Sequence, residues 1–280
     1  EIFIMDADGS NPTNITNRLV LADLYFARQR YEDAATQYGE ALAVNDKSTL
    51  AHVGLGRALM ESGDFTGAAE KFQAVIDLSK EEDISGKLVQ SSHYYLGSMA
   101  LEQGKPDEAV EQFKVATTME RTDSDAWYLL GTAYEQGGKL DEAILALEQA
   151  VLFVPNFTEA YEALADVFDQ KGASAGALYA RGMADYSRGD LGDAADKLEA
   201  AIAASPTLAE AHAGLGLVRE TQGQKDAAIV AYQQALQLKP DDFLAGGGLA
   251  RLTGASSVAE LPANHPTAGC GEGSEEGVTP

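Results

Sequence analysis

Cysteine, basic residues and long apolar runs are all scarce in this chain. Cys270 is the only cysteine among 280 residues, which excludes an internal disulfide and argues against a thiolate metal cluster. No apolar run approaches the ~18 residues of a membrane helix, so we expect no membrane insertion. The 20 Lys and Arg residues are outnumbered by 44 Asp and Glu residues, giving a net charge of −24. Because nucleic-acid binding requires clustered basic side chains, this balance argues against a nucleic-acid partner.

Motifs for catalysis are also missing. The chain contains no Gly-rich phosphate loop, nucleophile elbow or zinc-ligand spacing. Residues 6–11 resemble a calcium loop only in composition, because an EF-hand needs Gly at the sixth place and Glu at the twelfth. We therefore expect no catalytic residue, no metal site and no cofactor, and we predict that the protein is not an enzyme.

The sequence does contain a repeat of 34 residues. The string Gly-Asp-Phe-x-x-Ala-Ala-x-x-Phe starts at Gly63, and similar strings start at Gly104, Gly138, Gly189 and Gly223. Each unit holds two helix-length segments with apolar residues at i, i+3, i+4 and i+7, joined by a Gly-rich turn. Such a period predicts a solenoid, whose units bury their apolar faces against one another. The units in register span residues 15–48, 49–82, 90–123, 124–157, 175–208 and 209–242.

One unit, residues 124–157, resembles the tetratricopeptide repeat most closely. The family pattern is W-x2-L-G-x2-Y, then A-x3-F, then Ala and a late Pro. The resemblance covers roughly residues 15–253 and implies an all-α fold, a helical-hairpin solenoid of about six repeats plus capping helices. It also implies that the protein works by binding another protein. The matching residues of this unit are Trp127, Leu130, Gly131, Tyr134, Ala143, Leu147 in the Phe slot, Ala150 and Pro155.

Small residues and prolines support the hairpin prediction. Gly or Ala at the eighth position and Ala at the twentieth position of each unit let two helices approach closely, and a larger side chain would overpack the contact. Pro155, Pro206 and Pro240 are predicted to end the second helix of their units, because proline cannot continue a helix.

Two departures interrupt the period. Residues 83–89 are inserted between the second and third units, and we expect them to lengthen a helix or a loop. At residues 158–174 the phase slips by half a unit. One interpretation makes 158–171 the cap of a first block; the alternative is a continuous superhelix that tolerates one degenerate unit. The first interpretation divides the chain into a leader (1–14), four repeats plus a cap helix (15–171), a joint (172–174), two repeats plus a cap helix (175–253) and a tail rich in Gly, Pro and Glu (254–280).

The resemblance also indicates which residues face a partner. In tetratricopeptide proteins the first helices line a concave groove, mainly through positions 2, 5, 9 and 12 of each unit. Here those positions are aromatic, apolar and mildly acidic, which suits a peptide with apolar anchors and a basic residue. The alternative is that the tyrosines only pack on the adjacent helix. The groove residues implied by the resemblance are Arg57, Tyr94, Tyr128, Thr132, Tyr179, Met183 and Tyr186.

The start of the chain does not follow the repeat. Ile2, Phe3, Ile4 and Met5 form a short β-favouring run before an Asp-Gly turn. Residues 1–16 resemble one strand–turn unit of the WD40-like β-propeller repeats of bacterial extracytoplasmic proteins. Because an exposed strand edge pairs readily with another chain, we expect these four residues to contact a neighbouring subunit. The alternative is a mobile leader.

Two Asn-x-Thr triplets bear on location. Asn14 and Asn156 match the N-glycosylation pattern, which matters only if the chain is extracellular. With the propeller resemblance and a first residue that is Glu1 rather than Met, they favour an extracytoplasmic location, periplasmic or extracellular, over a cytoplasmic one.

The function predicted from the sequence is a non-catalytic scaffold that binds a protein or peptide in its concave groove. The alternative is a structural subunit of an extracellular homopolymer, with copies of the chain as partners. In that case the leader and the solenoid ends would make the subunit contacts, because head-to-tail contacts that do not close generate filaments.

Overall fold

The computed structural model describes residues 15–81 and 84–254. These residues form fourteen α-helices and no strand, joined by short turns as sequential hairpins. The predicted all-α hairpin solenoid is therefore confirmed. The predicted leader, residues 1–14, lies outside the described residues. The described residues divide into two compact units, with the boundary between residues 138 and 139.

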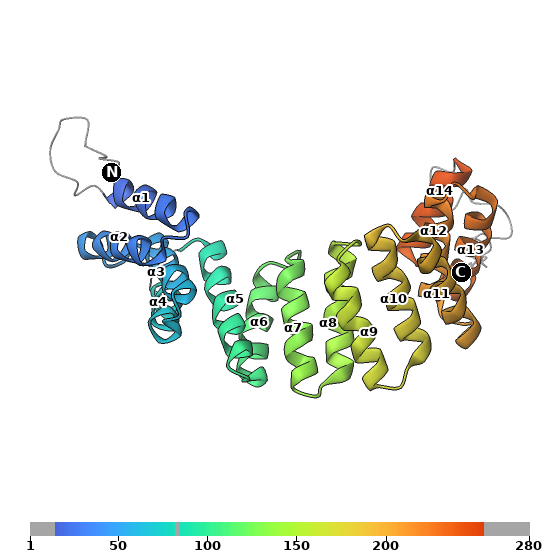
Figure 1. Ribbon diagram of the computed structural model, residues 1–280, viewed down its shortest axis with the longest axis horizontal. Helices are drawn as coiled ribbons and strands as arrows, with labels where there is room; N and C mark the ends of the chain where they lie inside the picture. Colours follow the sequence, from blue (N-terminus) through green and yellow to red (C-terminus); the bar gives the residue numbers. More distant parts are fainter. Residues whose placement is uncertain (1–14, 82–83, 255–280) are drawn as a thin grey trace, which may run out of the picture. The chain divides into compact units, whose positions relative to one another are not determined.

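The first unit contains helices α1 to α7, each packed against the next (Figure 1). Alternate helices also touch, so that α1, α3, α5 and α7 form one row. Because each hairpin contributes its first helix to this row, side chains at equivalent repeat positions line up along it. The helices span Ile15–Ala27 (α1), Tyr31–Val44 (α2), Thr49–Glu61 (α3), Phe65–Leu78 (α4), Gly86–Glu102 (α5), Pro106–Met119 (α6) and Ser124–Gln136 (α7).

The second unit contains helices α8 to α14, and its row consists of α10, α12 and α14. The row is odd-numbered in the first unit and even-numbered here, in agreement with the half-unit slip in the sequence. Helix α10 packs extensively against both α9 and α11, so it belongs to two hairpins at once. The helices span Leu140–Phe153 (α8), Thr158–Gln170 (α9), Ser174–Arg188 (α10), Leu191–Ala204 (α11), Ala209–Thr221 (α12), Lys225–Leu238 (α13) and Phe243–Thr253 (α14).

The turns within hairpins share one backbone geometry. Gly63 has a φ of 87°, and the next residue, Asp64, donates its backbone N–H to the carbonyl of Leu59 at 2.8 Å. This is the Schellman arrangement, which needs the left-handed conformation that glycine adopts without strain. Gly172, in the predicted joint, has the same geometry with a φ of 69°. The division into blocks of four and two repeats stays a prediction.

One large apolar residue fills the centre of the hairpin in each of the six repeat units found in the sequence. It lies at the twenty-fourth position of the unit, and we call it the wedge residue. The ring of Phe113 packs so close to Gly97 that a methyl group there would lie 2.9 Å from Cε1 of the ring. This contact explains why the eighth position is small. The wedge residues, all at most 3% exposed, are Tyr38, Phe72, Phe113, Leu147, Leu198 and Tyr232.

The insertion and the prolines affect the ends of helices. Helix α5 starts at Gly86 and buries Val89 and Gln90, so part of the insertion lengthens this helix. Helices α8, α11 and α13 each end two residues before a proline, with the intervening residue outside the helix. The three helices end where the prolines predict, and α2 and α6 end at the same repeat position without a proline.

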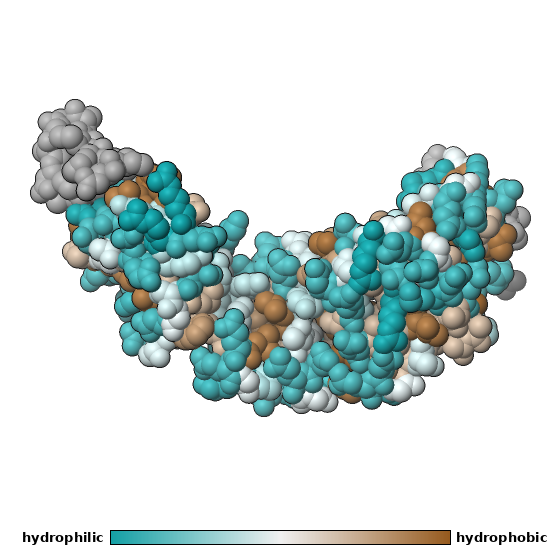
Figure 2. Space-filling model, viewed as in Figure 1, coloured by the Kyte–Doolittle hydropathy of each residue, from teal (hydrophilic) through white to brown (hydrophobic). Residues whose placement is uncertain are grey.

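The visible surface of both units is mostly hydrophilic, with apolar side chains in small scattered groups (Figure 2). None of the described helices combines the length and the hydropathy needed to cross a membrane.

Candidate functional site

The sequence-predicted groove residues of the first unit lie on α3, α5 and α7, which are consecutive members of its row. The guanidinium of Arg57 lies 4.5 Å from the centre of the Phe26 ring. The Tyr94 ring makes an edge contact with the Phe113 ring, and burial raises the pKa of Tyr94 to about 12. The Thr132 hydroxyl donates a hydrogen bond to its own helix. These side chains remain partly exposed and accessible to a partner.

The predicted groove residues of the second unit all lie on α10. Met183 is only 2% exposed, which places it in the core. The Tyr186 hydroxyl accepts a hydrogen bond from Thr221 on α12 at 3.4 Å. The Tyr179 ring meets the Tyr161 ring edge to face, with centroids 6.5 Å apart. Tyr179 and Tyr186 are therefore partly exposed, whereas Met183 is buried.

The charges of three carboxylates act on Tyr179. We call Tyr161, Tyr179, Glu148, Glu210 and Asp242 the tyrosine–carboxylate cluster. Burial, followed by the charges of its neighbours, raises the pKa of Tyr179 well above its usual value. Burial also raises the pKa of Glu148, and the Glu210 carboxylate adds to this shift. A bound cation would lower the pKa values of Glu148 and Tyr179, because it would favour the ionised form of each group.

The carboxylates of this cluster come from separate elements. Asp242 caps the N-terminus of α14 by accepting a hydrogen bond from the Ala245 backbone N–H at 2.8 Å. Glu210, on α12, pairs with the Lys239 ammonium at 3.2 Å. Sequence reasoning missed Glu148 and Asp242, which are distant along the chain. Glu210 occupies the second position of its unit, which is one of the groove positions of the family, so the sequence could have identified it.

A second feature is a polar cleft of about 390 Å³ among α9, α10 and α11. Helix α10 forms its base, while α9 and α11 form its sides. Helix α9, all of which is described, makes no extensive contact with α11, so the space between these two helices stays open. The cleft is lined by Glu162, Ala165 and Asp166 from α9, Arg181, Ala184, Asp185 and Arg188 from α10, and Lys197 from α11.

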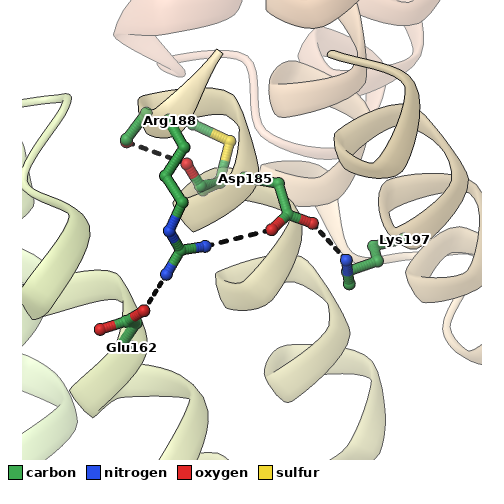
Figure 3. Close-up of polar contacts among 6 residues, drawn as sticks. Glu162, Asp185, Arg188 and Lys197 are labelled. Atoms are coloured by element: carbon green, nitrogen blue, oxygen red, sulfur yellow. Dashed lines mark hydrogen bonds and ion pairs between the residues drawn. The ribbon is translucent and has the colours of Figure 1, made fainter. Parts of the chain in front are cut away.

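Ion pairs hold the charged groups of the cleft in place. In Figure 3, Arg188 points toward both Glu162 and Asp185, and Asp185 lies between Arg188 and Lys197. The Arg188 Nη1 to Asp185 Oδ1 distance is 3.1 Å. The Asp185 side chain is only 13% exposed, so it anchors both cations.

The hairpin α9–α10 has an arginine at the position of the wedge residue. Counted from Thr158, the hairpin α9–α10 has its eighth position at Ala165 and its twenty-fourth at Arg181. Arg181 does not fill the hairpin; its side chain is 41% exposed and pairs with Asp169. Sequence reasoning missed this site, because it did not count 158–191 as a unit. Gly172, in register with Gly138, was the available signal.

The rings at the fourth repeat position have a structural role. His52 Nε2 donates to the Asp46 carbonyl at 2.8 Å, and His212 Nε2 donates to the Pro206 carbonyl at 3.0 Å. Trp127 makes the equivalent bond six residues back, at 2.8 Å. Among the described residues, no three His, Cys, Asp or Glu side chains are grouped to hold a metal ion.

Other sequence-predicted sites fall at the ends and in a turn. Asn156 is exposed between α8 and α9. The proposed subunit-contact residues Ile2, Phe3, Ile4 and Met5 and the other sequon residue, Asn14, lie outside the described residues.

Solved structures similar to this one are helical repeat proteins. A MamA crystal structure has a TM-score of 0.55 and 22% identity, covering 62% of this chain and 91% of its own. MamA from Desulfovibrio magneticus RS-1 has a TM-score of 0.57 and 19% identity, with coverages of 64% and 97%. The C-terminal part of a TPR repeat-containing protein from Cytophaga hutchinsonii has a TM-score of 0.55 and 17% identity, with coverages of 85% and 89%. At these identities the likeness shows the fold alone.

Sequence comparison with protein families is more specific. Two tetratricopeptide repeat families match, one at residues 19–83 and 179–243 and the other at residues 100–167. None of the curated protein sequences compared matches the chain. Tetratricopeptide repeat proteins are generally non-catalytic scaffolds for protein–protein interaction. The matched segments together cover most of the fourteen helices, and the chain therefore belongs to the tetratricopeptide repeat family.

Proposed function

We propose that this protein is a scaffold that holds a peptide segment of a partner against the row of helices α10, α12 and α14. The observation that carries the proposal is the tyrosine–carboxylate cluster. The partly exposed Tyr179 ring offers apolar contact area, and the three carboxylates favour a positively charged group beside it. The partner segment would therefore combine apolar side chains with Lys or Arg.

The charge of the whole chain supports a basic partner. A net charge of −24 attracts a basic segment over long range and speeds its encounter with the scaffold. Long-range attraction alone would not select a site. The cluster provides selection, because Tyr161 is 4% exposed and holds the Tyr179 ring in a fixed orientation.

Fluorescence anisotropy tests the proposal with two matched peptides. One short labelled peptide alternates Leu and Lys, and the other has Glu in place of Lys. We expect the Lys peptide to bind and the Glu peptide not to bind. Tyr179→Ala should weaken binding about tenfold or more, the effect of truncating an interface tyrosine. The control Tyr31→Ala, on α2 outside the first unit's row, should bind like the unaltered chain.

Equal weakening by Tyr179→Ala and Tyr31→Ala would contradict the proposal, because it would mean that binding has no defined site. Tight binding of the Glu peptide would contradict the predicted charge of the partner.

We further propose an extracytoplasmic location, which the exposed sequon at Asn156 supports. Mass spectrometry of the protein from its native source tests this, because an exposed asparagine in a turn is accessible to glycosylation. An unmodified Asn156 in a host that glycosylates would remove this support.

A further inference from the structure

We propose that Tyr94, on α5, and Asp125, on α7, form a second binding site for a Lys or Arg side chain, so that one chain binds two basic segments. The first unit would then carry the same recognition chemistry as the second unit. This inference rests on the proposed scaffold function and adds a second point of attachment. Tyr94 occupies the fifth position of its unit and Asp125 the second position of the next unit, as do Tyr179 and Glu210.

Tyrosine and an acidic residue occur together at these two positions. The rows of the two units contain five pairs of neighbouring helices, in which the fifth position of one helix can be compared with the second position of the next. An acidic residue follows in both pairs that begin with tyrosine and in none of the others. Because the other pairs pack without this combination, the fold does not require it. The residues in those three pairs are Leu19 and Leu50, Val53 and Ser91, and Ala213 and Leu244.

Hydrogen bonds place Tyr94 beside the start of α7. Gln90, one turn before Tyr94 on the same face of α5, donates from Nε2 to Oδ2 of Asp123 at 2.7 Å. Asp123 caps α7 by accepting a hydrogen bond from the Ala126 backbone N–H at 3.0 Å. After burial, the charges of Asp125 and then Asp123 are the causes that raise the pKa of Tyr94. We call Tyr94, Asp123 and Asp125 the first-unit site.

The ring and the carboxylate of this site are accessible and not used by each other. Asp125 is exposed and Tyr94 is partly exposed. Within residues 15–81 and 84–254, neither the Asp125 carboxylate nor the Tyr94 hydroxyl makes a hydrogen bond or an ion pair. Elsewhere in the chain such groups do bond, with the Tyr232 hydroxyl donating to Glu220 at 2.6 Å. The Asp125 carboxylate therefore does not serve to hold Tyr94, and its oxygens can accept bonds from a ligand.

The surroundings of the first-unit site favour a positively charged group. Helices α5 and α7 together contain a single Lys or Arg, and this residue, Lys87, lies two turns before Tyr94 and acts on Glu120. A Lys or Arg side chain suits the site, because its charge can pair with Asp125 while its stem or guanidinium lies on the Tyr94 ring. The charge of −24 attracts such a segment to both units.

The first-unit site should be the weaker of the two. The charges of two carboxylates act on Tyr94, whereas those of three act on Tyr179. We therefore expect the first-unit site to fill at a peptide concentration about tenfold higher or more. Binding at this site is what should remain when Tyr179→Ala removes the ring of the stronger site.

Fluorescence anisotropy of the labelled Lys peptide with the full chain tests this inference in a Tyr179→Ala background. We expect the weaker binding to remain in that variant. Adding Asp125→Lys should weaken it at least about tenfold further, because the charge beside the ring is reversed. The matched control is Glu32→Lys, which reverses an exposed charge at the second residue of α2, outside the row. It should weaken the remaining binding by less than about twofold, since it changes only the net charge.

Two further variants separate the contributions of the charge and the ring. Asp125→Asn keeps the shape of the side chain and removes its charge, so it should also weaken the remaining binding. Tyr94→Ala should do the same by removing the ring. Circular dichroism checks that each variant is folded, and Asp125→Asn keeps the test decisive if Tyr94→Ala does not fold.

The inference would be overturned if no binding remained in Tyr179→Ala, or if Asp125→Lys and Glu32→Lys weakened the remaining binding equally. Either result would leave the tyrosine–carboxylate cluster as the binding site of the scaffold. The converse result is binding that Asp125→Lys abolishes in the otherwise unaltered chain and that Tyr179→Ala does not change. That result would support the first-unit site and contradict the proposed role of the cluster, so the two proposals fail separately.

Discussion

Two hairpins share helix α10 and are built differently. In α10–α11 the wedge residue Leu198 is fully buried, and a methyl group at Gly182 would lie 2.9 Å from its Cγ. In α9–α10 the equivalent residue is Arg181, which is partly exposed and paired with Asp169. The first hairpin buries its wedge residue, whereas the second has an ion-paired arginine at that position and packs through other buried apolar residues, such as Leu164 and Val167.

The two hairpins differ in a side chain and not in the backbone of their turns. Both hairpins turn at a left-handed glycine, Gly172 or Gly189, so backbone geometry alone does not distinguish them. The side chain at one position decides whether the hairpin is filled. Exposed ion pairs contribute little net stability, whereas a fully buried apolar side chain contributes several times more.

The largest effect should come from removing a wedge residue. We expect Phe113→Ala to lower the free energy of unfolding by about 3–5 kcal/mol, because it leaves a cavity in a packed hairpin. Arg181→Ala, at the equivalent position, should cost less than about 1 kcal/mol, because it removes only a partly exposed ion pair. Urea unfolding followed by circular dichroism measures both. Similar losses would show that the two hairpins are held in the same way.

A smaller effect should come from the glycine beneath a wedge. Gly97→Ala should destabilise by about 1–3 kcal/mol, because its methyl group would lie 2.9 Å from the Phe113 ring. The matched control is Gly39→Ala in α2, where a methyl group meets nothing within 4 Å. It should stabilise by about 0.5–1 kcal/mol, since alanine favours a helix over glycine. The same urea unfolding measures this pair, and a loss of stability in both would count against close packing at Gly97.

Filling the cleft should convert one type of hairpin into the other. We expect Arg181→Leu to raise the free energy of unfolding by about 0.5–2 kcal/mol, because it fills a cavity. The advantage of the variant should grow with added salt, since salt screens the ion pairs of the unaltered chain. Thermal unfolding at low and high salt checks both statements. If the difference in stability between the variant and the unaltered chain narrows with added salt, the ion pairs do not stabilise this hairpin.

The smallest effect concerns the tyrosine–carboxylate cluster and pH. Burial raises the pKa of Glu148 above its usual 4.5, so the folded chain binds this proton more tightly than the unfolded chain. The stabilisation is present below pH 4.5 and is lost as the pH rises through the folded pKa. Glu148→Gln should therefore match the unaltered chain at low pH and be more stable at neutral pH, by less than about 1 kcal/mol.

Unfolding measured across this pH range checks the expectation. In a Glu210→Gln background the advantage should shrink, because the Glu210 carboxylate is the second cause of the shift. An advantage of equal size at every pH would rule out the proton as its source.

Much of the fold followed from the period of the sequence. Small residues, wedge residues and prolines at fixed spacing predict where each helix packs and ends, because these are local constraints. The groove positions of the family also selected Tyr179, which lies on α10 and is partly exposed. They selected Met183 as well, which is buried, because a position number cannot say which neighbours cover a side chain.

The sequence by itself determined the helical hairpins, their turns and the acidic character of the chain. Only the tertiary structure revealed that α10 takes part in two hairpins and that the charges of Glu148, Glu210 and Asp242 act on Tyr179. It also showed that Arg181, at the position of a wedge residue, is partly exposed and ion-paired. The physical reason is that hairpin geometry depends on residues close in sequence, whereas both sites depend on side chains from helices brought together by packing.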